Sequence, residues 1–131
     1  MAPPTPTRLI DTSIFVDLLR GHAPARAWLN SLLAGDAAIS AVTFADLVAG
    51  CTKAEEQHAL EKELASYPVL WLNESLSQVA LSLYRQNHLN HGVHFMDCVI
   101  ASTALAKGLT LCTSVGHVFQ AFNGLTIERP Y

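Results

Sequence analysis

Short apolar segments alternate with longer amphipathic segments along nearly the whole chain, and this order constrains the fold more than any other feature. Five short segments are predicted to be strands, namely residues 8–11, 37–40, 69–72, 109–112 and 125–130. The segments between them have the apolar spacing of helices, over residues 13–20, 24–35, 41–51, 53–67, 75–89 and 95–108. Short strands that lack strict alternation and are separated by helices are typical of a parallel sheet covered on both faces. We therefore predict an α/β fold of three layers with a mainly parallel, roughly five-stranded sheet.

The chain has the length of one domain and an apolar composition for a small protein. Its 131 residues are 50% hydrophobic and 15% charged, and the formal net charge is −3. This charge argues against a protein that binds nucleic acid through a generally basic surface. The apolar composition predicts a surface that a second copy or another protein covers, which we place on the early helices bearing Trp28, Leu29, Leu32 and Leu33. We expect residues 8–131 to form a single domain after a short disordered lead-in, residues 1–7, which holds three prolines.

Three features predict the compartment of the protein. The N-terminus lacks the basic and apolar segments of a signal peptide. No apolar run approaches the roughly 18 residues of a membrane span. Cys51, Cys98 and Cys112 have no CxxC spacing and fit reduced thiols. We therefore expect a cytoplasmic protein with no membrane partner.

The first predicted strand ends on a carboxylate. In the stretch "LIDTSIFVDLLRG", Asp11 follows the apolar pair Leu9 and Ile10, and the hydroxyl pair Thr12 and Ser13 comes next. Ligands of open parallel α/β sheets bind outside the carboxyl ends of the strands, so Asp11 is a candidate site residue. The alternative is that Asp11 only caps the following helix, although Ser13 is also a plausible N-cap.

Two further aspartates stand among apolar residues near predicted helix starts. Asp46 lies within "AVTFADLVAG" and Asp97 within "HFMDCVIASTALA". Each alone fits a cap or a surface position. Together with Asp11, they belong to different strand–helix units and could converge at one edge of the sheet. Three converging carboxylates would repel one another unless a divalent cation offset their charge, and oxygen ligands favour Mg²⁺ or Mn²⁺ over zinc.

The stretches around these aspartates resemble a known family. "LIDTSIFVDLLRG", "ISAVTFADLVAG" and "HGVHFMDCVIASTALAKGLTLCTS" resemble the motifs of PIN-domain ribonucleases, most closely the VapC-type toxins of toxin–antitoxin pairs. "GLTIERPY" resembles their closing strand, so the similarity spans about residues 8–131. The resemblance implies a PIN-like, Rossmann-like fold.

The resemblance also implies a function, a cofactor and partners. The chain would be a metal-dependent endoribonuclease, the toxin of a toxin–antitoxin system, with RNA as its substrate. Asp11, Asp46 and Asp97 would be the catalytic residues and would hold Mg²⁺ or Mn²⁺, with the hydroxyls of Thr12, Ser13, Thr113 and Ser114 as accessory groups. A small antitoxin would be its protein partner, and a homodimer its expected assembly.

The chain departs from the family pattern at two positions. Asp46 replaces the usual Glu and is one methylene shorter. Val115, in "CTSVG", stands where the family usually has Asp or Asn. The alternative function is therefore a catalytically impaired PIN-fold protein that acts as a binding partner.

Other candidate sites are weaker. Asp17 lies six residues after Asp11, which is about 240° around a helix, so it is expected to be solvated. His88, His91 and His94 are spaced three apart, but no Cys or acid completes a zinc set before Asp97. A receiver-like signalling domain fits least, since "LIDTS" has no acidic pair and "LCTS" no lysine.

Overall fold

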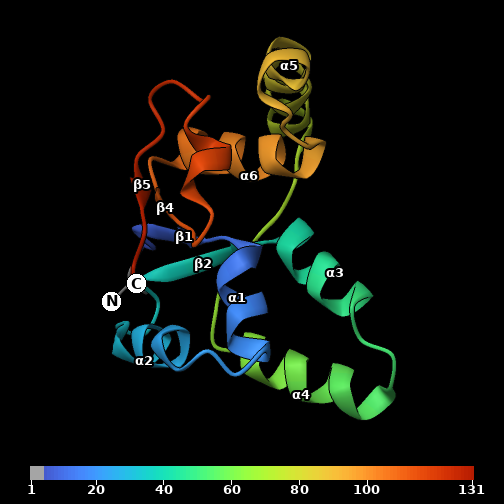
Figure 1. Ribbon diagram of the computed structural model, residues 1–131, viewed down its shortest axis with the longest axis vertical. Coiled ribbons are helices and arrows are strands. Elements are labelled where there is room, and N and C mark those ends of the chain that lie inside the picture. Colours follow the sequence, from blue (N-terminus) through green and yellow to red (C-terminus); the bar gives the residue numbers. More distant parts are fainter. Residues whose placement is uncertain (1–4) are drawn as a thin grey trace.

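A five-stranded parallel sheet forms the centre of the molecule (Figure 1). The computed structural model describes residues 5–131. The strands lie in the order β3-β2-β1-β4-β5, and every neighbouring pair is parallel. Their bounds are Arg8–Ile10 for β1, Ala37–Ser40 for β2, Val69–Leu70 for β3, Thr110–Cys112 for β4 and Ile127–Glu128 for β5. The prediction of an α/β fold with a five-stranded parallel sheet is confirmed.

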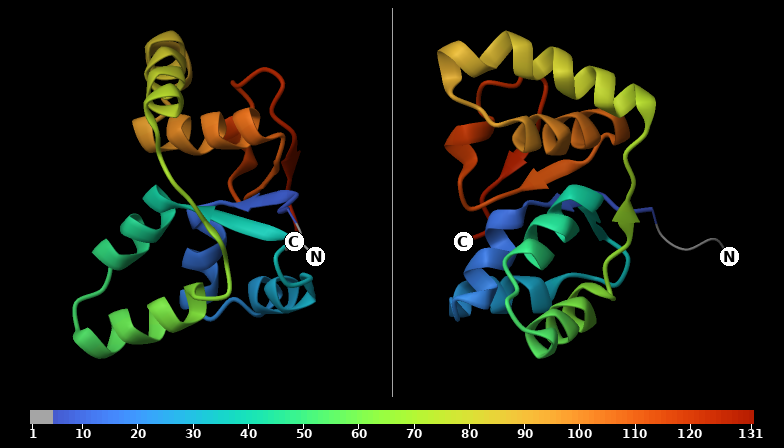
Figure 2. Two further views of the ribbon diagram at one scale, coloured as in Figure 1. Left: turned by 180° about the vertical axis from the view of Figure 1, so that it is seen from behind. Right: turned by 90° about the vertical axis from the view of Figure 1, so that its right-hand side faces the viewer.

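Helices cover both faces of this sheet (Figures 1 and 2). The helices α1 and α2 and the helix α4 lie on one side, and the helices α5 and α6 lie on the other. The helix α3 follows β2 and packs against α1 and α4, and it also touches α6. The bounds are Thr12–Leu19 for α1, Ala23–Ser31 for α2, Ala41–Ala49 for α3, Ala54–Leu64 for α4, Glu74–His91 for α5 and Phe95–Lys107 for α6.

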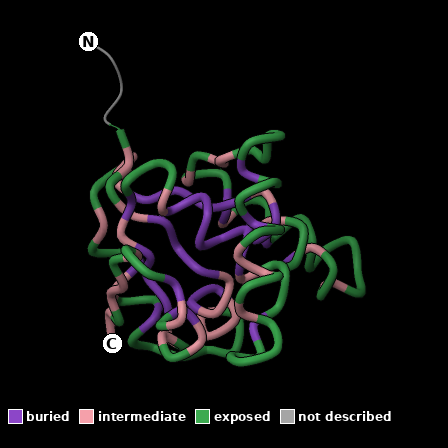
Figure 3. Tube along the Cα trace, turned by 90° about the horizontal axis from the view of Figure 1, so that it is seen from above, coloured by how far each residue is buried: buried purple, intermediate pink, exposed green. Residues whose placement is uncertain are grey.

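The hydrophobic core has two parts, one on each face of the sheet. Leu9 and Leu111 face the part that α6 covers, whereas Ile10 and Cys112 face the part that α1 and α2 cover. Neighbouring residues of β1 and β4 therefore bury their side chains on opposite faces, which explains why these strands are apolar throughout. Figure 3 shows the buried segments gathered at the centre of the molecule, with exposed helices around them.

Several boundaries differ from those predicted. The first helix begins at Thr12, because Asp11 rather than Ser13 is its N-cap. The strand predicted at 69–72 ends at Leu70 and leaves Trp71 and Leu72 exposed. The helix predicted over 24–35 ends at Ser31, and a short 3-10 helix, η1 (Gly116–Phe119), was not anticipated.

The N-terminal end of the chain bears on the predicted domain limits. Residues 1–4 of the expected disordered lead-in lie outside the described residues. Thr7, placed in that lead-in, donates its backbone N–H to the Asp36 carbonyl over 2.8 Å and accepts the N–H of Thr110 over 3.0 Å. Thr7 therefore already belongs to the edge of the folded domain.

The exposed apolar surface lies largely elsewhere than predicted. In and after α2, Leu29 is buried and Trp28 and Leu32 are half-buried, so only Leu33 is fully at the surface. A larger group of exposed apolar side chains comes from the segment after β3 and from α5, namely Trp71, Leu72, Val79, Leu81 and Leu89. Within residues 5–131, no helix has both the length and the apolar character needed to span a membrane.

Candidate functional site

Asp11 lies at the carboxyl end of β1, where the order of strands along the chain reverses. The strands β2 and β3 extend the sheet to one side of β1, and β4 and β5 extend it to the other. Asp11 donates its backbone N–H to the carbonyl of Cys112 at the end of β4, over 2.9 Å. Such a reversal opens a crevice at the carboxyl edge of a parallel sheet, and it is where ligands bind in folds of this kind.

The Asp11 carboxylate is buried and held by hydroxyl groups. Asp11 is only 4% exposed. Its Oδ2 accepts hydrogen bonds from Ser13 Oγ over 2.7 Å and from Thr113 Oγ1 over 2.8 Å. A longer contact of 3.4 Å from the Ser13 N–H caps α1. Both readings of Asp11 from the sequence are therefore compatible, because the same carboxylate caps a helix and faces the crevice.

Burial raises the pKa of Asp11 above its ordinary value. The hydrogen bonds from Ser13 and Thr113 act in the opposite direction, but they do not cancel the cost of removing the carboxylate from water. Within residues 5–131, none of the ion pairs involves Asp11. A buried carboxylate without a positive partner is costly, and a bound cation would remove that cost.

The predicted accessory hydroxyls form a network around Asp11. Ser13 Oγ lies 3.2 Å from Thr113 Oγ1 and accepts the backbone N–H of Ser114 over 3.1 Å. Thr113 Oγ1 also accepts the N–H of Val115 over 3.1 Å. Thr12 differs, since its hydroxyl turns toward α3 and donates to Thr43 Oγ1 over 3.0 Å. The network fixes the loop after β4 against the start of α1.

The three predicted acids line one pocket of about 360 Å³. Asp11 comes from the end of β1, Asp46 from α3 and Asp97 from the first turn of α6. Asp46 is exposed, whereas Asp97 is half-buried and accepts the backbone N–H of His94 over 3.0 Å, which caps its own helix. Among residues 5–131 no three His, Cys, Asp or Glu side chains are gathered closely enough to hold a metal ion as they stand.

Asp17 also belongs to this pocket, which the sequence reasoning did not anticipate. It is half-buried, lines the pocket with Asp11, and accepts a hydrogen bond of 2.8 Å from the hydroxyl of Tyr131. Burial, reinforced by this bond, raises the pKa of Tyr131, so its phenol stays protonated and donates. Asp11 is the N-cap of α1 and lies outside the helix, so the 240° offset from Asp11 does not give the azimuth of Asp17. Counting from Ser13, four residues earlier, places Asp17 on the face that meets the pocket.

The chemistry of these donors fits a divalent cation with oxygen ligands. Four carboxylates and one guanidinium, that of Arg20, line the pocket. In the part of the chain that the structure describes, none of the four aspartates forms an ion pair with Lys, Arg or His. Mg²⁺ and Mn²⁺ prefer carboxylate and water oxygens and retain several waters, so they require few direct protein ligands. The residues could therefore hold such an ion, since the hydrogen bond from His94 occupies only Oδ2 of Asp97 and leaves its Oδ1 available.

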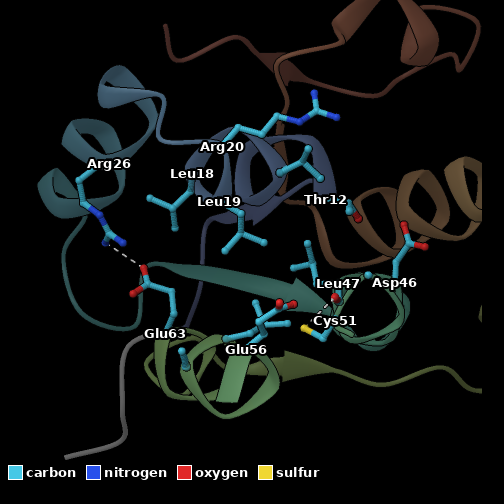
Figure 4. Close-up of a pocket in the computed structure, with 14 residues that line it drawn as sticks. Thr12, Leu18, Leu19, Arg20, Arg26, Asp46, Leu47, Cys51, Glu56 and Glu63 are labelled. Carbon is cyan, nitrogen blue, oxygen red and sulfur yellow. Dashed lines mark hydrogen bonds and ion pairs between the residues drawn. The ribbon is translucent and has the colours of Figure 1, made fainter. Parts of the chain in front are cut away.

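A second, larger groove adjoins the pocket and has an apolar floor (Figure 4). It measures about 830 Å³ and lies between α1, α3 and α4, with Val16, Leu18, Leu19, Leu47 and Leu60 among its lining residues. The ion pair of Arg26 with Glu63, 2.9 Å long, lies at one end, and Thr12 and Asp46 lie at the other. Thr12, Val16, Arg20 and Asp46 line both spaces, so the groove leads directly to the carboxylates.

Comparison with known families agrees with this geometry. The family model described as PIN domain matches residues 8–124. The chain belongs to the PIN domain family. Two relatives of this PIN domain in Mycobacterium tuberculosis are named ribonucleases. Ribonuclease VapC10 is 34% identical over 120 residues, covering 89% of each chain. Ribonuclease VapC19 is 32% identical over 128 residues, covering 95% of this chain and 99% of the relative.

Solved structures share the fold of this PIN domain. A chain of a toxin–antitoxin complex from Klebsiella pneumoniae superposes with a TM-score of 0.78 and 22% identity, covering 95% of this chain and 98% of the other. The resemblance to PIN-domain proteins of the VapC type, read from three short motifs, is therefore confirmed over nearly the full chain.

Proposed function

We propose that this PIN-domain protein is an endoribonuclease that depends on Mg²⁺ or Mn²⁺ and acts as the toxin of a toxin–antitoxin pair. The observation that carries the proposal is the Asp11 carboxylate, which is buried at the reversal of strand order, without a cationic partner among residues 5–131, in a pocket lined by three more aspartates. Its similarity to relatives named ribonucleases supports RNA as the substrate.

The residues of the pocket divide the work of such an enzyme. Asp11, Asp46 and Asp97 would hold the metal ion, which supplies Lewis acidity toward the phosphate and lowers the pKa of a bound water. Ser13 and Thr113 hold the Asp11 carboxylate in one orientation. Arg20, exposed at the rim, is suited to bind an RNA phosphate and so to position the backbone over the acids. Ser114 offers a further hydroxyl beside them.

Cleavage of single-stranded RNA with and without metal tests the proposal. We expect cleavage with Mn²⁺ or Mg²⁺, none with EDTA, and a rate about tenfold lower for Asp97→Asn. The matched control is Glu61→Gln, which removes one exposed carboxylate of α4 outside the pocket and should leave the rate unchanged. If the protein cleaves no RNA in any divalent metal, the enzyme proposal is wrong, and a binding role for an impaired PIN domain replaces it.

The apolar groove is the site where we propose that an antitoxin binds. Its floor of Val16, Leu18, Leu19 and similar side chains is suited to the apolar face of a partner helix. Because the groove leads into the carboxylate pocket through Thr12 and Asp46, a partner lying along it would also block access of RNA to Asp11. Binding and inhibition would then be the same event.

A homodimer is proposed separately, through the segment between β3 and α5. The exposed side chains of Trp71 and Leu72, in the segment between β3 and α5, are apolar and could be covered by a second copy. Trp71 is 72% exposed, and tryptophan is enriched in protein–protein interfaces. This surface is distinct from the groove, so dimer formation and antitoxin binding are compatible.

We further propose that the protein acts in the cytoplasm, where its three cysteines, all unpaired in the structure, stay reduced.

Sedimentation of two variants separates the two surfaces. We expect the purified chain to sediment as a dimer, and a larger complex to form when it is co-expressed with a candidate antitoxin. Leu19→Asp places a charge in the groove and should prevent the larger complex while leaving the dimer. Trp71→Asp should prevent the dimer while leaving antitoxin binding intact, since the Trp71 side chain lies outside the groove. A monomer at tens of micromolar would contradict the dimer, and a complex unaffected by Leu19→Asp would contradict the groove.

A further inference from the structure

The last residue of the chain returns to the pocket. Tyr131 lies beyond β5, and its hydroxyl donates to Asp17 Oδ2 over 2.8 Å, 114 residues away in sequence. Its ring also packs against the ring of His22, with centroids 5.3 Å apart. The C-terminus therefore lies beside α1 (Figure 2, right). Two independent contacts hold the Tyr131 ring, so its hydroxyl is aimed at Asp17 rather than free to rotate into solvent.

Asp17 is oriented by a neutral donor rather than by a cation. Among residues 5–131 its carboxylate forms no ion pair, and Tyr131 is the residue whose side chain donates to it. A phenol is a neutral donor, so this bond places no positive charge beside the carboxylate and leaves its remaining lone pairs available. Because Oδ2 is held by Tyr131, the rotamer of Asp17 is restricted, and less side-chain entropy is lost when the carboxylate engages a cation.

We infer that Asp17 is a fourth acid of the proposed nuclease site and that Tyr131 is its positioning residue. The inference rests on the proposed function, because it assigns both residues to the same pocket as Asp11. Asp17 lines that pocket together with Asp11, Asp46 and Asp97, and it approaches from a helix that Asp11 itself caps. A carboxylate held by Tyr131 is prepared to bind a cation or one of its waters, whereas a purely structural tie would not affect metal affinity.

Three single variants separate these roles. Asp17→Asn keeps an oxygen that accepts the Tyr131 hydrogen bond but removes the charge. Tyr131→Phe keeps the ring against His22 but removes the hydroxyl. Tyr67→Phe is the matched control, since Tyr67 is a half-buried tyrosine that packs on Phe15 and does not line the carboxylate pocket. Each is compared with the unchanged protein by calorimetric titration with Mn²⁺ and by RNA cleavage across Mn²⁺ concentrations.

We expect Asp17→Asn to weaken Mn²⁺ binding five- to tenfold and Tyr131→Phe to weaken it about threefold, with thermal midpoints little changed. Tyr67→Phe should bind Mn²⁺ as the unchanged protein does. A double variant, Asp17→Asn with Val115→Asp, restores a carboxylate to the pocket from the loop after β4 and should recover much of the affinity, because both positions line the same pocket.

The outcomes distinguish the two levels of the proposal. If the unchanged protein neither binds Mn²⁺ nor cleaves RNA, the proposed function and this inference both fail. If it does both, and Asp11→Asn loses both, but Asp17→Asn and Tyr131→Phe keep the affinity and the cleavage rate of the unchanged protein, only the inference about Asp17 and Tyr131 is overturned.

Discussion

Asp11→Asn is expected to reduce RNA cleavage at least a hundredfold and, in the absence of divalent metal, to raise the thermal midpoint. The loss follows because Asp11 is the most buried of the pocket carboxylates, and two orders of magnitude correspond to about 2.7 kcal/mol of transition-state stabilisation. The gain in stability follows because Asn removes a buried charge, while its side-chain oxygen can still accept the hydrogen bonds of Ser13 and Thr113.

The pH dependence of this gain has a definite sign. Burial raises the pKa of Asp11 in the folded state above its ordinary value, so the folded state binds the proton more tightly than the unfolded chain. The stability that this protonation provides is complete below the unfolded pKa and is lost as the pH rises through the folded pKa. At neutral pH the unchanged protein therefore lacks the stability that protonation of Asp11 provides. The difference in midpoint between Asp11→Asn and the unchanged protein should be largest near pH 7 and should shrink toward pH 4.

Thermal unfolding in EDTA at several pH values checks this expectation. A domain of this size shifts by about 3 to 5 °C per kcal/mol of stability, so we expect a measurable rise of the midpoint for Asp11→Asn at pH 7. Asp97→Asn is the comparison, because Asp97 is less buried and caps its own helix, so its loss should not stabilise the protein. Mn²⁺ should stabilise the unchanged protein and not Asp11→Asn. A lower midpoint for Asp11→Asn in EDTA would contradict the account of Asp11 as a buried charge without a cationic partner among residues 5–131.

The fold could be predicted from the sequence because its signals are local. The apolar runs at Leu9, Ile39 and Leu111 are short and continuous, which is typical of strands buried on both faces. The exact ends of the strands could not be predicted in this way, because they depend on pairing partners far away in sequence. The strand expected to include Trp71 and Leu72 ends at Leu70, where the pairing of β3 with β2 stops.

The site could be predicted in part, for a similar reason. Asp11 could be identified from local sequence, because the 13-residue stretch from Leu9 to Gly21 places a carboxylate directly after a short apolar strand. The contribution of Asp17 depends on Tyr131, which lies 114 residues away, and no local pattern reports such a contact. The helix arithmetic for Asp17 also assumed that Asp11 was part of the helix, whereas Asp11 is its N-cap. The groove beside the pocket combines side chains of α1, α3 and α4, so it required the tertiary arrangement.

Val115→Asp is expected to increase RNA cleavage tenfold or more at little cost in stability. Val115 is the position at which the resemblance to PIN-domain ribonucleases expects an acid, and its side chain lines the carboxylate pocket. The residue is 38% exposed, so a carboxylate there stays hydrated. Its backbone N–H donates to Thr113 Oγ1, a bond that the substitution keeps. One added ligand or water-orienting contact needs to be worth only about 1.4 kcal/mol in the transition state for a tenfold gain.

Val118→Asp is the matched control for this gain, because the two valines differ in their surroundings. Val118 lies three residues further along, within η1, and packs against the hydrophobic core on the α6 side of the sheet. A carboxylate at that position is expected to cost several kcal/mol and to lower the midpoint strongly without any gain in rate. The measurement is paired, with cleavage rate against Mn²⁺ concentration and thermal midpoint for each variant. If Val115→Asp behaves like Val118→Asp, with a large loss of stability and no faster cleavage, then Val115 is a packing residue and the loop after β4 supplies only hydroxyls to the site.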